Sequence, residues 1–356
     1  MRASVLILIV VLLIAPKASG QGFADLGADA EEYSQVTPGQ TLVFPADHGA
    51  HPGFRIEWWY LTANLEGTDG ETYGIQYTLF RQAGAPPPER DGWANQQFWL
   101  GHIALTTASR HFYAERIARG GIGHAGVRPS PFAAWIDDWQ LAASDEAAAE
   151  TALGFGALRL SARGDDFAYD LGLTTEMPPI LQGEAGYSVK SDRGQASYYY
   201  SQPYFLAEGT IEIEGRTIPV SGRAWLDREW SSQPLAADQS GWDWFSLHLD
   251  ETTKMMLFRL RHDDGQHYFS GNWIDGSEST PIPGDQIELE ILEETDVAGR
   301  TVPTGWRVKV GARGVDVTVA PLNPKAWNGT QIGYWEGPVR GAGSHDAIGY
   351  LEITGY

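Results

Sequence analysis

The sequence of 356 residues contains no cysteine, so disulfide bonds, thiol catalysis and a cysteine-linked lipid anchor are all excluded. It also has little positive charge: 25 lysines and arginines stand against 46 aspartates and glutamates, which gives a net charge of −21. Nucleic acids and anionic membrane surfaces select basic patches, so we expect neither as a partner. A Gly-x-Ser-x-Gly elbow is absent as well, which leaves a serine nucleophile without support.

Long hydrophobic runs are absent after the first twenty residues, so we expect no transmembrane segment in the mature chain. The apolar run Val5–Ala15 follows the positive charge of Arg2 and is too short to span a bilayer. The small residues Ala18–Gly20 come next and form a cleavage pattern. We therefore predict a signal peptide over residues 1–20 and a soluble mature protein that is exported to the periplasm or the extracellular space.

The composition favours β-structure, with 12% aromatic residues and 42 glycines. Short runs of alternating apolar and polar residues recur along the chain between turn residues. Arg55–Leu65 and Thr72–Arg81, for example, are joined by hairpin-turn residues. This spacing predicts an antiparallel barrel or sandwich rather than βαβ units. We interpret one segment, Phe112–Gly126, as a short helix or an irregular stretch.

The second half of the chain repeats the pattern of the first. Trp58 and Trp242 each lie seven residues before a leucine that ends a predicted strand. In both halves a turn, a Leu-Phe-Arg run and a third predicted strand then follow. Three similar strands in the same order indicate two related β-barrels in tandem.

A stretch in the middle of the chain alternates charged residues with tryptophans. On a regular strand, Asp227 and Glu229 share one face with Trp225, whereas Arg228 and Trp230 lie on the opposite face. Charged residues resist burial unless they are paired, and tryptophan is usually buried. The alternation therefore predicts a strand that lines a cavity with a polar floor and aromatic walls.

Six motifs, spread over nearly the whole mature chain, resemble the AttH/CrtC-like family of exported, lipocalin-like proteins. They are HPGFRIEWWYLTANL (His51–Leu65), YYYSQP (Tyr198–Pro203), GRAWLDREWSSQPL (Gly222–Leu235), GWDWFSLHL (Gly241–Leu249), YWEGPV (Tyr334–Val339) and GYLEITGY (Gly349–Tyr356). The resemblance implies an all-β fold of two tandem lipocalin-like antiparallel β-barrels, with a cavity inside one barrel or between the two. We expect domains at residues 21–235 and 236–356, joined near Ser231–Ser240.

The family resemblance also implies a reaction, because its members include carotenoid 1,2-hydratases. Those enzymes carry an aromatic-x-Asp-His-Asn-Trp pattern whose aspartate is the proton donor. The matching run here keeps Asp227 and has Trp225 as its aromatic residue. Upstream, where the hydratases have a His-x-Trp pair, this chain has Tyr198 and Tyr200. The histidine is therefore missing, and this departure weakens the hydratase assignment but not the fold.

Hydration of an isolated alkene needs an acid that protonates carbon, a wall that stabilises the resulting cation, and a positioned water. Asp227 can be the acid if burial or the neighbouring Glu229 raises its pKa. The competing interpretation is structural, because buried carboxylates are usually ion-paired. Candidate partners for the two carboxylates are Arg228, Arg55, Arg81 and Arg259.

Seven aromatic residues are predicted to bind a ligand. They are Trp225, Trp230, Tyr198, Tyr200, Trp58, Trp242 and Trp244. The function predicted first is an exported protein that binds an extended apolar, isoprenoid-like or lipid-like small molecule. The alternatives are a hydro-lyase or isomerase of the carotenoid-hydratase type that uses Asp227, and a non-catalytic structural or interaction protein.

A metal site has little support in the sequence. Asp47, His48, His51 and Glu57 lie close together, but glycine and proline surround them and the helical spacing of a His-Glu-x-x-His motif is absent. We interpret these histidines as residues that hydrogen-bond to neighbouring strands. No metal and no cofactor is expected, and the sequence carries no signal for an oligomeric state.

Overall fold

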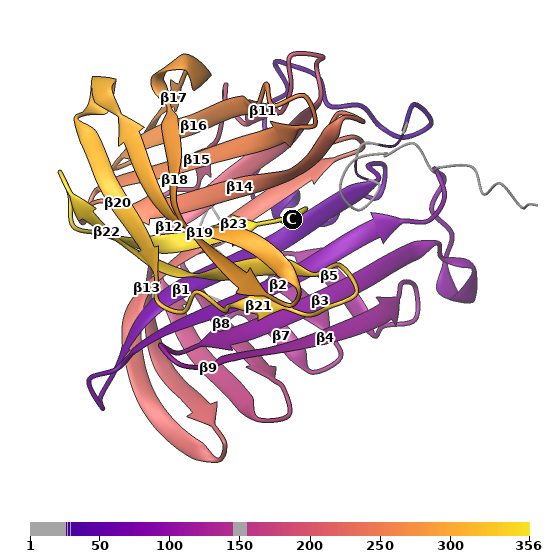
Figure 1. The fold of residues 1–356 in the computed structure, drawn as a ribbon. Helices are drawn as coiled ribbons and strands as arrows, with labels where there is room; N and C mark the ends of the chain where they lie inside the picture. The colour runs from indigo at the N-terminus through magenta and orange to yellow at the C-terminus, as the bar shows by residue number, and fades with distance from the viewer. Residues whose placement is uncertain (1–25, 27, 29, 145–154) are drawn as a thin grey trace, which may run out of the picture.

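The computed structural model describes residues 26, 28, 30–144 and 155–356. The predicted signal peptide, residues 1–20, lies outside these residues. The fold is all-β, as predicted, and consists of two curled antiparallel sheets that follow one another along the chain (Figure 1). Within the described residues, no helix is both long and apolar enough to cross a lipid bilayer.

Sheet A is built from the first half of the chain. Its strands are β1 (Ile56–Gly67), β2 (Thr72–Ala83), β3 (Gln97–Thr106), β4 (His111–Arg119), β5 (Ala125–Pro129), β6 (Phe132–Ile136), β7 (Trp139–Ala143), β8 (Ala157–Arg163), β9 (Phe167–Thr174), β10 (Ile180–Leu181), β11 (Tyr187–Val189), β12 (Ala196–Ile213) and β13 (Arg216–Ser231). Their order across the sheet is β4-β3-β2-β1-β13-β12-β9-β8-β7-β6-β5, and β10 and β11 pair with β12.

Sheet B is built from the second half. Its strands are β14 (Gln239–His248), β15 (Thr253–His262), β16 (Tyr268–Asp275), β17 (Glu278–Ile282), β18 (Glu288–Val297), β19 (Arg300–Val310), β20 (Val315–Pro321), β21 (Trp327–Asn328), β22 (Tyr334–Gly343) and β23 (Ala347–Ile353). Their order is β17-β16-β15-β14-β23-β22-β20-β19-β18, and β21 pairs with β22. Short 3-10 turns lie at Ala46–His48, Gly92–Ala94, Gly284–Gln286 and Gly311–Arg313.

The two sheets share a strand arrangement that matches the repeat in the sequence. In each, the first strand pairs with the second and also with the last strand, which curls the sheet round on itself: β1 pairs with β2 and β13, and β14 pairs with β15 and β23. Trp58 lies near the start of β1 and Trp242 near the start of β14. The last strand of sheet A ends at Ser231, and the first strand of sheet B begins at Gln239.

The interpretation of Phe112–Gly126 as helical or irregular was wrong. The segment forms most of β4 and the start of β5. Strand β4 pairs with β3 along its whole length, from His111 opposite Thr106 to Arg119 opposite Phe98. The hydrogen bonds of this pairing satisfy the backbone of a segment whose own side-chain pattern is ambiguous.

The described part of the chain contains three hydrophobic clusters. One lies within sheet A and includes Trp59 and Leu226, and a second lies within sheet B and includes Trp306. The third lies between the sheets and includes Tyr199 and Met256. Strand β1 contacts β23 and β2 contacts β22, so the sheets pack face to face along these strands. We call the curled sheet A barrel A. Residues on its outer face therefore become buried against sheet B.

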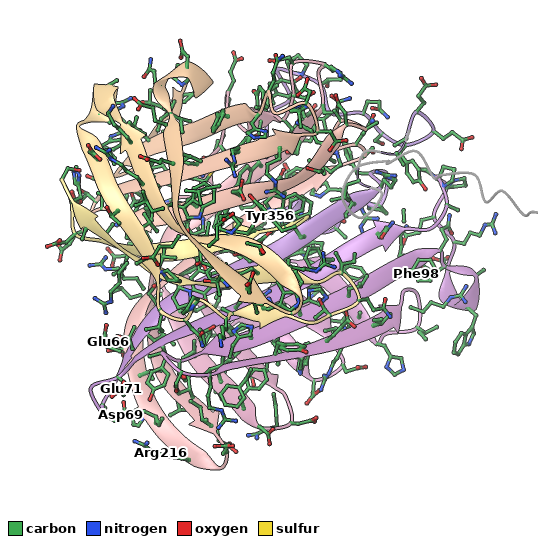
Figure 2. All side chains as sticks on the ribbon, in the orientation of Figure 1. Glu66, Asp69, Glu71, Phe98, Arg216 and Tyr356 are labelled. Carbon is green, nitrogen blue, oxygen red and sulfur yellow. The ribbon has the colours of Figure 1, made fainter. Side chains whose placement is uncertain are left out.

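Polar pairs close the far end of sheet A, where two hairpins meet. Arg216, in the β12–β13 hairpin, forms a 2.9 Å ion pair with Asp69 in the β1–β2 turn, and Tyr73 donates a hydrogen bond to the same carboxylate (Figure 2). At the C-terminus, the Tyr356 hydroxyl donates a 3.1 Å hydrogen bond to Asp243 of sheet B. The first contacts join the two hairpins of sheet A, and the second holds the C-terminus against β14, whose residues Trp242 and Trp244 line the cavity described below.

Candidate functional site between the sheets

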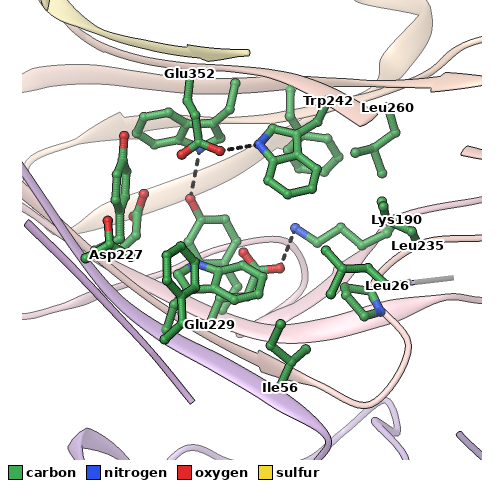
Figure 3. Close-up of a pocket in the computed structure, with 17 residues that line it drawn as sticks. Leu26, Ile56, Lys190, Asp227, Glu229, Leu235, Trp242, Leu260 and Glu352 are labelled. Carbon is green, nitrogen blue, oxygen red and sulfur yellow. Dashed lines mark hydrogen bonds and ion pairs between the residues drawn. The ribbon is translucent and has the colours of Figure 1, made fainter. Parts of the chain in front are cut away.

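A cavity of about 100 Å³ lies in the interface between sheet A and sheet B (Figure 3). Its apolar walls include Ile56, Trp58, Phe80, Trp242, Trp244 and Phe258. A second cavity of about 80 Å³ adjoins it and shares Phe80, Trp242 and Glu352 with it. Typical small-molecule sites measure about 300–1,000 Å³, so the space fits a slender apolar segment better than a bulky ring system.

Asp227 of β13 lies in the first cavity and is 2% exposed. The Trp225 indole donates a 2.8 Å hydrogen bond to its Oδ1, and the Ser201 hydroxyl donates to the same oxygen. In the part of the chain that the structure describes, no lysine or arginine forms an ion pair with this carboxyl. Burial therefore raises the pKa of Asp227 to about 7, and the charge of Glu229 adds to the rise while the hydrogen bonds oppose it.

Glu229 has a different environment from that of Asp227. The Lys190 ammonium lies 2.9 Å from its Oε1, and the Ser197 hydroxyl donates to the same oxygen. The ammonium also lies over the Phe258 ring, 4.4 Å from its centroid. The Lys190 ammonium thus neutralises the charge of Glu229, whereas Asp227 forms no such ion pair among the described residues. The two carboxyl groups of β13 therefore have different electrostatic environments.

Glu352 of β23 faces the same cavity from sheet B. The Trp242 indole donates a 2.5 Å hydrogen bond to its Oε1 (Figure 3). Burial raises the pKa of Glu352 to about 7, and the charges of Asp227 and Glu229 on the opposite sheet add to the rise. The cavity therefore holds two carboxyl groups, one from each sheet, that can each gain or lose a proton near neutral pH.

Five of the nine residues predicted for the site line this cavity: Asp227, Glu229, Trp58, Trp242 and Trp244. Trp225, a sixth, lies on the same face of β13 and contacts Asp227 and Trp244, with its ring at 6.4 Å from the latter. Alternation along the strand thus placed the carboxylates and Trp225 on one face, as the sequence indicated.

Tyr198, Tyr200 and Trp230 are not part of this cavity, because they lie on the opposite face, inside barrel A. The Tyr200 hydroxyl is hydrogen-bonded to His48 at 2.6 Å, and Trp230 stacks on the His51 ring at 4.1 Å. The pairing of β12 with β13 explains the placement. Tyr200 lies opposite Arg228 and Tyr198 opposite Trp230, both positions on the inner face of the sheet.

Five polar residues that line the cavity had no predicted role: Tyr60, Thr78, Lys190, Tyr199 and Glu352. Tyr199 lies opposite Glu229 in the β12–β13 pairing, and its hydroxyl accepts a 3.2 Å hydrogen bond from Trp244. A sequence signal existed for Glu352, which interrupts an apolar run of the last motif. Tyr199 and Lys190 become recognisable only once the register of β12 is known.

The arginines proposed as partners of the carboxylates bind other groups. Arg228 and Arg81 both form ion pairs with Glu57, which is completely buried. Arg259 pairs with Asp243 at 2.6 Å. The structural interpretation therefore applies to Glu229, through Lys190, and to the buried arginines themselves.

The remaining predicted arginine, Arg55, donates to the backbone carbonyls of Ser232 and Leu26. The loop residue His51 hydrogen-bonds to Asp47 and to Glu57, so these three residues of the short polar segment contact one another. Among the described residues, no group of three or more histidine, cysteine, aspartate or glutamate side chains is arranged to hold a metal ion.

Two curled antiparallel sheets with a cavity between them define a protein of the lipocalin-like, two-barrel class. The chain belongs to the AttH-like family, whose model matches residues 35–356. The crystal structure of an AttH protein from Nitrosomonas europaea is similar, with 33% sequence identity and a TM-score of 0.80 over 91% of this chain and 99% of the other.

Kievitone hydratases are more distant relatives. The crystal structure of the enzyme from Nectria haematococca has a TM-score of 0.64 at 16% identity, over 91% of this chain and 97% of the other, which shows the shared fold. The kievitone hydratase of Fusarium solani subsp. phaseoli is 22% identical over 172 residues. That alignment covers 44% of this chain and 46% of the relative, so this chain matches less than half the relative's length.

Proposed function

We propose that the cavity between the sheets binds the slender apolar part of a small molecule, and that Asp227 protonates a carbon–carbon double bond there. The protein would then act as a hydro-lyase that adds water to an alkene. The observation that carries the proposal is a buried carboxyl group that forms no ion pair with any lysine or arginine among the described residues and is set among aromatic rings in an apolar cavity. The similarity to kievitone hydratases points in the same direction. We also propose that the protein works after export, once residues 1–20 have been removed.

The reaction balances with these residues. The proton of the Asp227 carboxyl forms a bond to one alkene carbon, and the other carbon becomes a cation. A water molecule adds its oxygen to that cation and loses one proton to a carboxylate, so the net change is the addition of one water. A carboxyl with a pKa near 7 suits this role, because it is both protonated in a large fraction of molecules and able to give up its proton.

The aromatic walls supply the stabilisation that the cation needs. Trp58, Trp244 and Tyr199 border the cavity and present aromatic rings to a bound molecule. A cation over such a ring gains about 2 kcal/mol when water is excluded. Two or three rings together therefore lower the barrier to protonation by several kcal/mol, and the same walls favour an apolar ligand through burial of its surface.

The test is incubation of the purified protein with isoprenoid and prenyl-substituted alkenes in heavy-oxygen water, followed by mass spectrometry. We expect a product that has gained one labelled water, and we expect Asp227→Asn to abolish it. Asp170→Asn is the matched control, since Asp170 lies on the surface in an ion pair with Arg159. Unchanged turnover in Asp227→Asn would overturn the assignment of the acid. A ligand that binds tightly without reacting would identify a carrier instead.

A further inference from the structure

Glu336 and Glu352 form a carboxyl pair on sheet B, in which Glu352 faces the cavity and Glu336 lies on the neighbouring strand. They are opposite each other in the antiparallel pairing of β22 with β23, so their side chains lie on the same face of sheet B. Glu336 is 1% exposed, and Glu352 lines both parts of the cavity. Two carboxylates this close, with so little water around them, repel each other, so the pair retains a proton at neutral pH.

The pKa of Glu336 agrees with this arrangement. Burial raises the pKa of Glu336 well above its ordinary range, and the charge of Glu352 is the next cause. Three polar groups surround the Glu336 carboxyl. Tyr60 of β1 donates a 2.5 Å hydrogen bond to Oε1, Asn328 donates a 3.3 Å hydrogen bond to Oε2, and Tyr334 is hydrogen-bonded to the carboxyl as well.

Hydrogen bonds continue from Tyr334 to the surface of the protein. The Tyr334 hydroxyl is hydrogen-bonded to Nδ1 of His102 at 3.0 Å. The other ring nitrogen, Nε2, lies 3.1 Å from Oε1 of Glu115, whose side chain is 20% exposed. Imidazole, hydroxyl and carboxyl groups each accept a proton at one atom and release one at another, so a line of them can pass protons along.

We infer that the carboxyl pair of Glu336 and Glu352 exchanges protons with solvent along this line of side chains. The proton path consists of Glu352, Glu336, Tyr334, His102 and Glu115, and Glu352, Tyr334 and His102 all line the second cavity. The path crosses from β22 and β23 of sheet B to β3 and β4 of sheet A. It exists only where the two sheets are packed together, which gives the interface a role beyond the formation of the cavity.

The inference rests on the proposed function and completes its proton balance. Asp227 gives its proton to the alkene, and Glu352, on the opposite side of the cavity, accepts the proton that the added water releases. After one turnover Asp227 is a carboxylate and Glu352 is protonated. The path lets Glu352 return its proton to solvent, and Asp227 regains one when the cavity opens to release product. No net proton is consumed.

His102 is in contact with side chains from three strands and also lines the second cavity. Glu115 approaches it from β4 and Tyr334 from β22, while the Phe80 ring of β2 packs at 5.3 Å. The Tyr334 hydroxyl receives a further, 3.4 Å hydrogen bond from the Gln76 amide, which cannot pass a proton on. Among the side chains that contact His102 and Tyr334, those that can pass a proton on therefore link Glu115 to the carboxyl pair.

The test measures proton exchange in the ligand-free protein. Rapid transfer into heavy water shifts the infrared band of protonated carboxyl groups, and subtraction of the Glu336→Gln spectrum isolates the band of the pair. We expect exchange of this band to slow at least about tenfold in Tyr334→Phe, because protons must then wait for local opening of the fold. Glu115→Gln, which keeps a hydrogen-bonding oxygen but removes the outer carboxyl, is expected to slow it as well.

Tyr77→Phe is the matched control, since Tyr77 is equally buried and its hydroxyl donates to the backbone carbonyl of Ala134 inside barrel A. Its exchange rate should equal that of the wild type. Equal rates in Tyr334→Phe, Tyr77→Phe and wild type would overturn the proton path. Because this measurement needs no substrate, failure of the hydration assay would count against the proposed reaction alone.

Discussion

The Trp225 indole donates a 2.8 Å hydrogen bond to Oδ1 of Asp227, two positions further along the same strand. The bond stabilises the charged carboxylate and so opposes the rise in pKa that burial causes. It also holds the carboxyl in one orientation towards the cavity. Trp225 therefore serves the acid directly, as a hydrogen-bond donor, in addition to its place among the aromatic rings.

Replacement of Trp225 by phenylalanine keeps the aromatic packing and removes the donor. We expect the pKa of Asp227 to rise above its value of about 7, because the carboxylate loses one of its hydrogen bonds. Carbon NMR of labelled aspartate side chains measures the titration. Trp242→Phe is the control, since its lost hydrogen bond belongs to Glu352. An unchanged titration in Trp225→Phe would show that the indole does not tune the acid.

The sequence predicted the class of fold because its signals are local. Alternating residues and turn residues marked the strands, and the echo between Trp58 and Trp242 marked the two sheets. The face of β13 that carries Asp227 also followed from simple alternation. The segment Phe112–Gly126 was misjudged, since only its pairing with β3 makes it a strand.

The composition of the site could be predicted only in part, because it depends on register between strands distant in sequence. Tyr198, Tyr199 and Tyr200 are indistinguishable by composition, and a shift of one residue exchanges their faces. Lys190 reaches Glu229 from the position directly after the short strand β11, in a segment that has no marked sequence pattern. Glu352 joins the cavity from the other sheet, and no local rule relates it to Asp227.

The difference between neighbouring tyrosines gives a second prediction. Tyr199→Phe removes a hydroxyl that is hydrogen-bonded to Asp227, so the pKa of Asp227 should rise and turnover should fall. Tyr200→Phe removes a bond to His48 inside barrel A, which should cost about 1–3 kcal/mol of stability and leave the Asp227 titration unchanged. NMR titration and chemical denaturation of both variants separate the two effects. The reverse pattern would place the functional face inside barrel A.

Glu57 is the carboxylate to which two buried arginines bind inside sheet A, and its removal should be severely destabilising. The carboxylate pairs with Arg81 and Arg228, which hold the pKa of Glu57 far below its ordinary value although burial opposes them. Glu57→Gln leaves two buried guanidinium groups without a counter-charge, at an expected loss of about 3–5 kcal/mol. Urea denaturation measures the free energy of unfolding.

The control for Glu57 is Glu66→Gln, which breaks the surface pair between Glu66 and Arg340. Both of its members are more than half exposed, so we expect a change of at most about 1 kcal/mol. Similar losses in Glu57→Gln and Glu66→Gln would contradict a structural role for the buried network.

Lys190 and Glu229 should behave as a buried ion pair that is costly to break from one side. Lys190→Met leaves the Glu229 carboxylate uncompensated, with an expected loss of about 3–5 kcal/mol near neutral pH. Addition of Glu229→Gln should recover much of this loss, because the remaining amide carries no charge. A double-mutant cycle by denaturation measures the coupling. Additive losses in the double variant would mean that the two side chains do not depend on each other.

Asp227 makes the protein less stable as pH rises, whereas a carboxylate in an ion pair makes a protein more stable as pH rises. Its pKa is about 7 in the folded protein, against an ordinary value of 3.8, so the folded state binds an extra proton between these two pH values. The free energy of unfolding therefore falls as pH rises through this range. Above pH 7 the cost is on the order of 4 kcal/mol. Asp227→Asn removes it, so the variant should gain about that much relative to wild type between about pH 4 and pH 8. Denaturation at both pH values measures the gain, and Asp170→Asn should show none. An equal pH dependence in wild type and Asp227→Asn would mean that Asp227 does not retain its proton in the folded protein.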